Sequence, residues 1–177
     1  MEQSRLRLEH YNLQRVSLQP VDDVEPTPLG AYANFAHAKL GSKVVSGVMT
    51  LANDETRHTI ELTLTGGPKE PGAAFPYQFE IGYIGIFDGR ELPEAQRDNL
   101  VMVNGTSMLY GIARETLLGL TTRSEKGAML LPSVHFAQLA QQGDQEAAEA
   151  AQAALAEPKA LAEPKASGAG RGPKAQP

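Results

Sequence analysis

The segment from Arg57 to Thr65 alternates strictly between two kinds of side chain, and it constrains the fold more than any other part of the chain. One set of alternate positions carries His58, Ile60, Leu62 and Leu64. The other set is polar and carries Thr59, Glu61, Thr63 and Thr65. Because successive side chains of a strand point to opposite faces, this pattern predicts a half-buried antiparallel strand with one face toward solvent.

Three further strands are predicted around this one. The first runs from about Leu6 to Leu18 and has room for a bulge, and Pro20, Pro26 and Pro28 force a turn after it. An apolar stretch over about residues 32–51, interrupted by Gly41 and Ser42, gives the second, and the turn at residues 53–55 follows it. The last begins at Tyr77 and alternates through Tyr83. The four predict an antiparallel sheet with one wet face.

Helical spacing begins after the last strand. Pro93 is suited to open a helix, and Asn104-Gly105 is expected to break it. Thr106 is then a candidate N-cap for a second segment, whose apolar residues recur every three or four positions. After Leu130-Leu131-Pro132, Ser133 is a candidate cap for a last helix. The predicted class is α+β, with a long broken helix packed on one face of the sheet and a second C-terminal helix.

The C-terminal part is low in complexity. The sequence AEPKA occurs at 156–160 and again at 162–166, without aromatic residues nearby. Such a composition buries too little apolar surface to offset its ordering entropy. We expect one domain over residues 1–142, a helical extension over 143–156 and a disordered tail over 157–177.

Bulk composition narrows the function classes. The chain has 177 residues, 41% of them hydrophobic, which suits one core. A net charge of −5 argues against a nucleic-acid partner. The amino terminus has no apolar signal stretch, and no window reaches the ~18 apolar residues of a membrane span. We therefore expect a cytoplasmic protein, and the absence of cysteine fits a reducing compartment.

Residues able to perform catalysis are sparse. The histidines lie far apart, without metal-binding spacing, at His10, His37, His58 and His135. Neither a nucleophile elbow nor a phosphate-binding loop is present. An enzyme with a helix-wrapped antiparallel sheet, such as a hotdog-type thioesterase, would need an acid near the start of the central helix, where this chain has Asn104, Thr106 and Ser107. We expect no enzyme, no cofactor and no metal.

Apolar and aromatic residues are the strongest candidates for a binding function. A four-stranded sheet with one helix encloses little volume, so part of this set must be covered by another subunit or exposed as a groove. A groove rich in aromatic residues and methionine beside a free strand edge would suit unfolded segments of varied sequence. The candidates for this groove are Tyr32, Phe35, Val44, Val48, Tyr77, Phe79, Tyr83, Ile86, Phe87 and Met102.

A second candidate surface is acidic. Glu61 and Glu80, with Gln78, fall on the solvent side of neighbouring strands. This face predicts either an ordinary soluble surface or a docking site for a folded partner. A dedicated adaptor is therefore an alternative function, and its binding would weaken at high ionic strength.

Several motifs resemble the protein-export chaperone SecB and its SecB-like relatives. They are LYGIARE at 109–115, Gly85-Ile86-Phe87, and Leu131-Pro132-x-Val134-x-Phe136 followed by Leu139. In order of elements the resemblance covers about Leu6 to Gln142. It implies a homotetramer, a dimer of dimers, that binds non-native chains in apolar grooves. Tyr77, Ile86 and Phe87 match groove-side positions of that pattern, and Tyr32 or Phe35 stands near its groove aromatic.

The chain also departs from the family pattern. Export-type members dock the motor protein SecA on an acidic sheet face; Glu80 matches one such position, but Arg15 and Gln19 stand where the first strand would be acidic. Gly111 replaces one residue of a usual Pro-Tyr pair. We therefore predict an ATP-independent holdase for unfolded or nascent polypeptides with a weakened link to SecA. A solitary SecB-like chaperone dedicated to one client, such as an antitoxin, is the alternative. Tyr77→Ala or Phe87→Ala is expected to weaken client capture and leave assembly intact.

Overall fold

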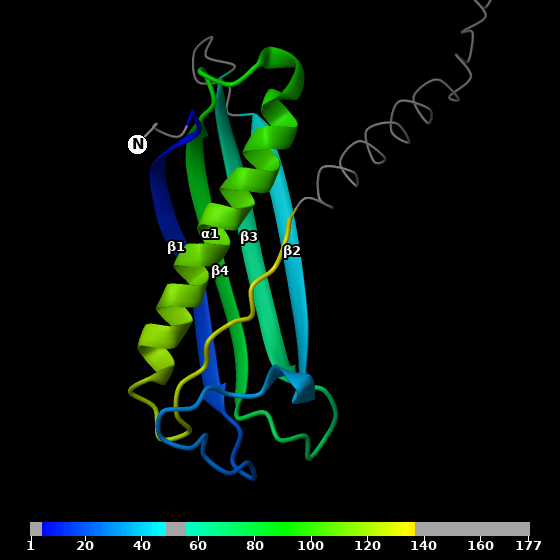
Figure 1. The fold of residues 1–177 in the computed structure, drawn as a ribbon, viewed down its shortest axis with the longest axis vertical. Coiled ribbons are helices and arrows are strands. Elements are labelled where there is room, and N and C mark those ends of the chain that lie inside the picture. Colours follow the sequence, from blue (N-terminus) through cyan, green and yellow to red (C-terminus); the bar gives the residue numbers. More distant parts are fainter. Residues whose placement is uncertain (1–4, 49–55, 137–177) are drawn as a thin grey trace, which may run out of the picture.

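The computed structural model describes residues 5–48 and 56–136. Within them, one sheet carries one long helix across one face (Figure 1). The predicted turn at 53–55, the helical extension at 143–156 and the tail at 157–177 lie outside the described residues, as does Leu139. No helix in the described part is long and apolar enough to cross a membrane.

Four antiparallel strands form the sheet in the order β1-β4-β3-β2. Their bounds are Arg7–Pro20 for β1, Ala38–Val48 for β2, Arg57–Pro68 for β3 and Tyr77–Asp88 for β4. The connection from β1 to β2 crosses one end of the sheet, so β1 and β2 become its two edges (Figure 1). A short 3-10 helix η1, Phe35–His37, lies in this connection just before β2. The predicted α+β class and antiparallel sheet are confirmed.

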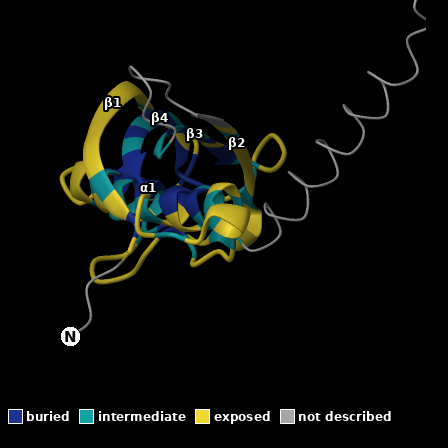
Figure 2. Cartoon of the chain, turned by 90° about the horizontal axis from the view of Figure 1, so that it is seen from above, coloured by how far each residue is buried: buried dark blue, intermediate teal, exposed yellow. Residues whose placement is uncertain are grey.

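The predicted alternation on β3 is confirmed. Its inward residues His58, Ile60, Leu62 and Leu64 are buried. On β4 the buried inward residues are Tyr77, Phe79, Ile81, Tyr83 and Phe87. Both sets face the helix, so the core is one layer between β3, β4 and the helix (Figure 2).

Strand β1 contains two bulges, which agrees with the bulge expected there. Its register against β4 shifts between Leu8 and His10 and again between Leu13 and Arg15. Each bulge adds one residue to β1, so that two apolar residues three positions apart can point to the same face of the sheet. As a result Leu8, Tyr11 and Leu13 all lie opposite residues on the helix side of β4.

The helix is continuous, so the predicted break at Asn104-Gly105 is wrong. After a 3-10 turn η2, Glu94–Gln96, helix α1 runs from Arg97 to Thr121. Gly105 is buried, and a Cβ at this position would lie 2.4 Å from the Cδ1 atom of Ile60. The glycine therefore allows the helix to approach the sheet closely, and it does not end the helix. Thr106 is buried in the helix interior and is not an N-cap.

The segment after α1 is extended as far as the structure describes it. Residues 128–136 have no regular secondary structure, and the helix expected after a cap at Ser133, beginning with Phe136 and Leu139, lies for the most part outside the described residues. We refer to residues 128–136 as the exit segment. It returns along the helix side of the sheet, between α1 and β2 (Figure 1). Pro132 lacks a backbone N–H and disfavours a helical conformation of Leu131 before it.

The β1–β2 connection is fastened to the end of α1. Lys126 is buried, and its Nζ donates hydrogen bonds to the carbonyl oxygens of Asp22 and Val24 at 3.0 and 2.7 Å. The backbone N–H of Thr27 donates to the carbonyl oxygen of Lys126 at 2.9 Å. Carbonyl partners satisfy the desolvated ammonium group, so this lysine has a structural role that holds two distant loops together.

His58 is the buried titratable group beneath the start of α1. Burial lowers the pKa of its imidazole, the nearby Asp98 carboxylate opposes this shift, and Arg97 adds to it. The distance from His58 Nδ1 to Asp98 Oδ1 is 3.7 Å. The ring is therefore neutral in the folded protein near neutral pH and packs as part of the core.

Candidate functional site

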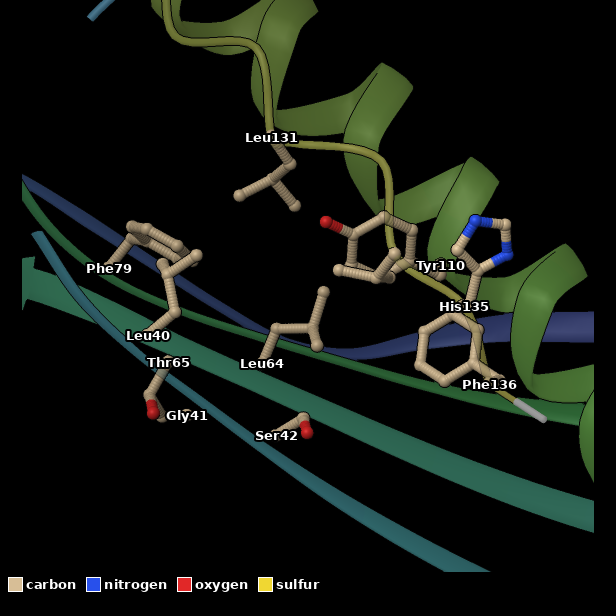
Figure 3. Close-up of a pocket in the computed structure, with 11 residues that line it drawn as sticks. Leu40, Gly41, Ser42, Leu64, Thr65, Phe79, Tyr110, Leu131, His135 and Phe136 are labelled. Carbon is tan, nitrogen blue, oxygen red and sulfur yellow. The ribbon is translucent and has the colours of Figure 1, made fainter. Parts of the chain in front are cut away.

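A cavity of about 260 Å³ opens between β2, α1 and the exit segment. Its apolar side chains come from β2, β3, β4, α1 and the exit segment and converge on the cavity (Figure 3). We call it the β2 groove. It is lined by Leu40, Gly41, Ser42, Leu64, Thr65, Phe79, Tyr110, Leu131, Val134, His135 and Phe136.

The floor of the β2 groove depends on a glycine. Leu40, Gly66 and Phe79 lie opposite one another on neighbouring strands. A Cβ at Gly66 would lie 2.3 Å from the ring of Phe79 and 2.9 Å from Leu40. Because Gly66 has no side chain, the Phe79 ring can lie over it on the sheet. This ring forms an aromatic floor for the groove.

Tyr110 forms the wall on the helix side. Its hydroxyl donates a hydrogen bond to the carbonyl oxygen of Pro132 at 2.6 Å. Its ring meets Phe136 edge to face, with the centroids 5.4 Å apart. Burial raises the pKa of the Tyr110 hydroxyl, and Arg114 partly offsets this effect. These contacts hold the exit segment against α1, and the Tyr110 ring faces the cavity (Figure 3).

The chemistry of the β2 groove is that of a binding surface. Its polar groups are Ser42, Thr65, His135 and the Tyr110 hydroxyl, which is hydrogen-bonded to Pro132, and the rest of its lining is apolar or glycine. No group of three or more His, Asp or Glu side chains that could hold a metal ion occurs within residues 5–48 and 56–136. The groove can therefore receive apolar side chains, with a few hydroxyl groups at its margin.

The aromatic residues of β4 that were predicted to line a groove are buried. Tyr77, Phe79, Tyr83 and Phe87 are each at most 4% exposed, and of these only Phe79 borders the β2 groove. The Tyr77 hydroxyl donates to the carbonyl oxygen of Gly127, and burial raises its pKa while Ser124 opposes the shift. The Tyr83 hydroxyl is 2.7 Å from Thr116 Oγ1. Their positions favour a role in the core.

The other predicted groove residues are spread over the molecule. Tyr32 is exposed on the β1–β2 connection, and Phe35 packs against the ring of Phe75 at 5.1 Å. Val44 is half-buried on the helix side of β2, Met102 is half-buried on α1, and Ile86 is half-buried on the opposite face of the sheet. The side chain of Val48 lies outside the described set. The structure does not bring this group into one site.

The sequence interpretation missed several residues of the β2 groove. The missed apolar residues are Leu40, Leu64, Tyr110, Leu131, Val134 and Phe136. Most of these were visible as motifs, since Tyr110 lies within LYGIARE and three others within Leu131-Pro132-x-Val134-x-Phe136. The motif at residues 131–136 was expected to start a helix, and this expectation hid the fact that it lies along the β2 side of the sheet.

A second apolar surface lies on β1 and the outward side of α1. On the helix side of β1, Tyr11, Leu13 and Val16 are 48%, 46% and 44% exposed. Figure 2 shows β1 exposed along most of its length. An open hollow borders this stripe and is lined by Leu8, Tyr11, Met108, Gly111, Ile112, Glu115 and Thr116. Contiguous apolar surface of this kind marks an interaction site.

The predicted docking face lies on the side of the sheet away from α1. Glu61, Gln78 and Glu80 fall there, on β3 and β4. Arg15 of β1 reaches the same face, and its Nη1 is 2.6 Å from Glu80 Oε1. Gln19 lies opposite Gln78 in the register of β1 and β4. The acidic character expected from Glu80 is therefore offset locally by Arg15.

Comparisons with known proteins identify relatives of this chain. A family model described as preprotein translocase subunit SecB matches residues 39–147. The protein-export protein SecB of Alkalilimnicola ehrlichii is 31% identical over 124 residues, which cover 67% of this chain and 65% of the relative. That of Aromatoleum aromaticum is 34% identical over 88 residues, covering 50% of this chain and 55% of the relative. The chain thus spans less than two thirds of the length of these curated relatives.

The fold also has a counterpart among solved structures. The SecB-like chaperone Rv1957 of Mycobacterium tuberculosis, solved in complex with a ChAD peptide from the HigA1 antitoxin, superposes with a TM-score of 0.50. The match covers 73% of this chain and 91% of the other at 14% identity, so it supports the fold. The family match extends from β2 through α1 and the exit segment, which together form the β2 groove. The chain belongs to the SecB family.

Proposed function

We propose that this protein is an ATP-independent holdase, a chaperone that keeps non-native polypeptides from aggregating by binding their apolar segments. The observation that carries the proposal is the open β2 groove, whose apolar walls lie next to a sheet edge. Membership of the SecB family supports it. Each apolar side chain buried there gains about 25 cal/mol per Å² of surface removed from water, less the cost of ordering the client.

The clients follow from the same chemistry. A soft aromatic groove accepts many apolar side chains, which suits unfolded or nascent chains, and the curated relatives are named protein-export proteins. A single dedicated client is the second candidate. It is favoured by the structural relative that was solved with an antitoxin peptide. A cytoplasmic location, expected from the sequence, stays a prediction.

The groove is tested by one pair of variants on the same strand. Leu40 and Val45 are both on β2 and are 42% and 48% exposed. Leu40 borders the β2 groove, whereas Val45 points to the opposite face with Glu61. Leu40→Ser is expected to weaken suppression of aggregation of a denatured client several-fold, because about 1–2 kcal/mol of apolar contact is removed. Val45→Ser should match the unmodified protein. Light scattering without ATP is the measurement.

Two results would contradict the groove assignment. Equal loss of protection in both variants would indicate a general effect on the sheet. Full activity of Leu40→Ser would place client binding elsewhere. If the unmodified protein suppresses no aggregation at all, general chaperoning fails and a single dedicated partner becomes the leading reading.

We further propose that the protein assembles as a homotetramer through the apolar surface of β1 and α1. The exposed stripe of Tyr11, Leu13 and Val16 supports this, because an uncovered apolar surface beside a sheet edge favours association. Gly111 lines the hollow beside this stripe, where the absence of a side chain leaves room for a second copy to approach α1.

The assembly has its own pair of variants. Leu13→Glu should yield smaller species than the unmodified protein by multi-angle light scattering, because it buries an unpaired carboxylate in the proposed interface. Asn12→Glu, one residue earlier and on the opposite face, should leave the mass unchanged. An unchanged mass for Leu13→Glu would exclude this surface as the interface.

SecA is proposed to bind weakly, if at all, to the outer face. Arg15 pairs with Glu80 there and adds positive charge to a surface that would need to be acidic. Of the three residues considered for the enzyme alternative, Thr106 is wholly buried, and the side chain of Asn104 donates to the carbonyl oxygen of Leu100 in its own helix. If Glu61, Gln78 and Glu80 bound a folded partner as an adaptor surface, the affinity for that partner would fall strongly as the salt concentration rises.

A further inference from the structure

We propose that an acidic segment of this chain, residues 144–157, folds back over the edge of β2 onto Lys39 and Lys43 and limits access to the β2 groove. The contact is autoinhibitory, because a client must displace it to reach the cavity. The limit on access rests on the proposed holdase function, whereas the contact itself does not. Three observations carry the inference: the place where the described chain ends, two lysines without a carboxylate partner, and the uneven charge of the sequence that follows.

The described chain ends at the β2 groove. Phe136 is its last residue and lines the cavity together with Ser42 of β2. The acidic segment begins eight residues later, at Asp144. Eight extended residues reach about 26 Å, which exceeds the ~10 Å that separates packed sheet layers. Because β2 is the last strand of the sheet, the chain can pass around this edge from the helix side to the outer side.

Lys39 and Lys43 lie on the outer side of β2, the side away from α1. They flank Leu40 and Ser42, which border the groove, so each lysine is next in sequence to a groove residue. Both lysines are exposed, and on β3 they face a glycine and a threonine. Neither forms an ion pair with another described residue. The outer side of β2 therefore offers two positive charges to carboxylates.

The sequence after Phe136 divides by charge. Residues 137–157 contain no lysine, arginine or histidine, and their acidic residues are Asp144, Glu146, Glu149 and Glu157. The basic residues come only afterwards, at Lys159, Lys165, Arg171 and Lys174. The part of the sequence that is tethered closest to the two lysines of β2 thus carries the opposite charge. This order favours pairing between the segment and the strand beside which the chain leaves.

The arginines of the same outer face already have partners. Arg15 Nη1 is 2.6 Å from Glu80 Oε1, and Arg57 Nε is 3.1 Å from Glu9 Oε2. These ion pairs join β1 to β4 and to the start of β3, away from the β2 edge. An acidic segment that leaves beside β2 therefore meets the two lysines as the nearest cations of this face without a carboxylate partner among the described residues.

The tether makes a weak contact sufficient. Exposed ion pairs each contribute little, so a detached copy of the segment would bind the lysines poorly. Joined to the same chain, the segment is present at an effective concentration in the millimolar range. We expect the contact to be closed in about half to two thirds of the molecules, which lowers the apparent affinity for clients about 2- to 3-fold. Weak clients lose most occupancy, because tight clients saturate the groove in either case.

The contact is tested directly by zero-length carbodiimide crosslinking of the full chain, which joins an ammonium group to a carboxylate that is paired with it. Peptide mapping should find Lys39 or Lys43 joined to the acidic segment. Isotope-labelled and unlabelled chains, refolded together, distinguish links within one chain from links between copies. Absence of any link from the segment to these lysines would overturn the contact. Links that occur only between copies would overturn folding back within one chain.

The effect on the groove is measured with a neutral apolar peptide by fluorescence anisotropy. Asp144→Asn/Glu146→Gln/Glu149→Gln and Lys39→Gln/Lys43→Gln should each raise the affinity about 2- to 3-fold. Their combination should raise it no further than either set alone, because both sets remove the same contact. Added salt should bring the unmodified protein toward the variants. Additive gains, or no gain, would overturn the autoinhibitory role.

Two matched variants control for net charge. Arg123 is exposed beyond the end of α1, and Lys159 and Lys165 follow the acidic segment. Arg123→Gln and Lys159→Gln/Lys165→Gln should leave the peptide affinity unchanged. A gain equal to that of the Lys39→Gln/Lys43→Gln variant would indicate a long-range charge effect and overturn the assignment. If crosslinks form but no peptide binds, the proposed function fails and the contact is supported. If the peptide binds every variant equally, only this inference fails.

Discussion

Phe87→Ala is expected to lower the free energy of unfolding by about 3–5 kcal/mol, the usual effect of removing a buried phenylalanine. Phe87 is completely buried, and its ring lies about 3 Å from the positions where Cβ atoms would stand on Gly85 and Gly105. The ring fills the space between the helix and the sheet together with the buried side chains of Ile60 and Leu109. The cavity left by alanine could close only if α1 moved.

Ile86→Ala is the matched control. Ile86 is the preceding residue of β4, is half-buried and points to the face away from α1, so its truncation should have a much smaller effect. Urea unfolding of both variants at one protomer concentration measures the difference, because assembly contributes to apparent stability. Near-normal stability of Phe87→Ala with a loss of client capture would instead support the groove role predicted for Phe87 from the sequence.

The sheet could be predicted because its signal is local. The alternation from His58 to Leu64 specifies a two-faced strand without reference to any other part of the chain. One bulge in β1 was also expected, and the register shifts at two places; Leu13 and Val16, for example, are spaced by three where a regular strand would need two or four. These features depend only on near neighbours in sequence.

The binding site could not be predicted in the same way. Alternation assigns Phe79 and Phe87 to one face, but it does not reveal that α1 seals Phe87 while Phe79 reaches the cavity. The β2 groove joins Leu40 to Phe136, residues far apart in the chain. Their contact depends on the path of the exit segment, which local propensity around Ser133 assigned to a helix.

Gly105 illustrates how the same residue can signal two structures. Glycine is a poor helix former, so Asn104-Gly105 was expected to end a helix. In the folded protein the helix is stabilised by packing on β3 and β4, and this outweighs a propensity loss of about 1 kcal/mol. The side chain of Asn104 donates to the carbonyl oxygen of Leu100 at 2.9 Å, which is compatible with the helix.

Gly105→Val is therefore expected to destabilise the fold by about 1–3 kcal/mol or more, although valine has the higher helix propensity. A Cβ at position 105 would lie 2.4 Å from Ile60 Cδ1 and 3.1 Å from Phe87 Cζ. Ile60 and Phe87 are completely buried, so neither side chain can turn outward to relieve the contact. The helix must lift from the sheet, which would also shift Tyr110 and the wall of the β2 groove.

Gly119→Ala provides the opposite expectation on the same helix. Gly119 is exposed, and no atom lies within 4 Å of its would-be Cβ. Alanine there should raise stability by up to about 1 kcal/mol through helix propensity alone. Thermal and urea unfolding of the two variants should thus move in opposite directions. If Gly105→Val also stabilised the protein, α1 could not pack closely on Ile60. Gly105 would then only weaken the helix through its low helix propensity, as first expected from the sequence.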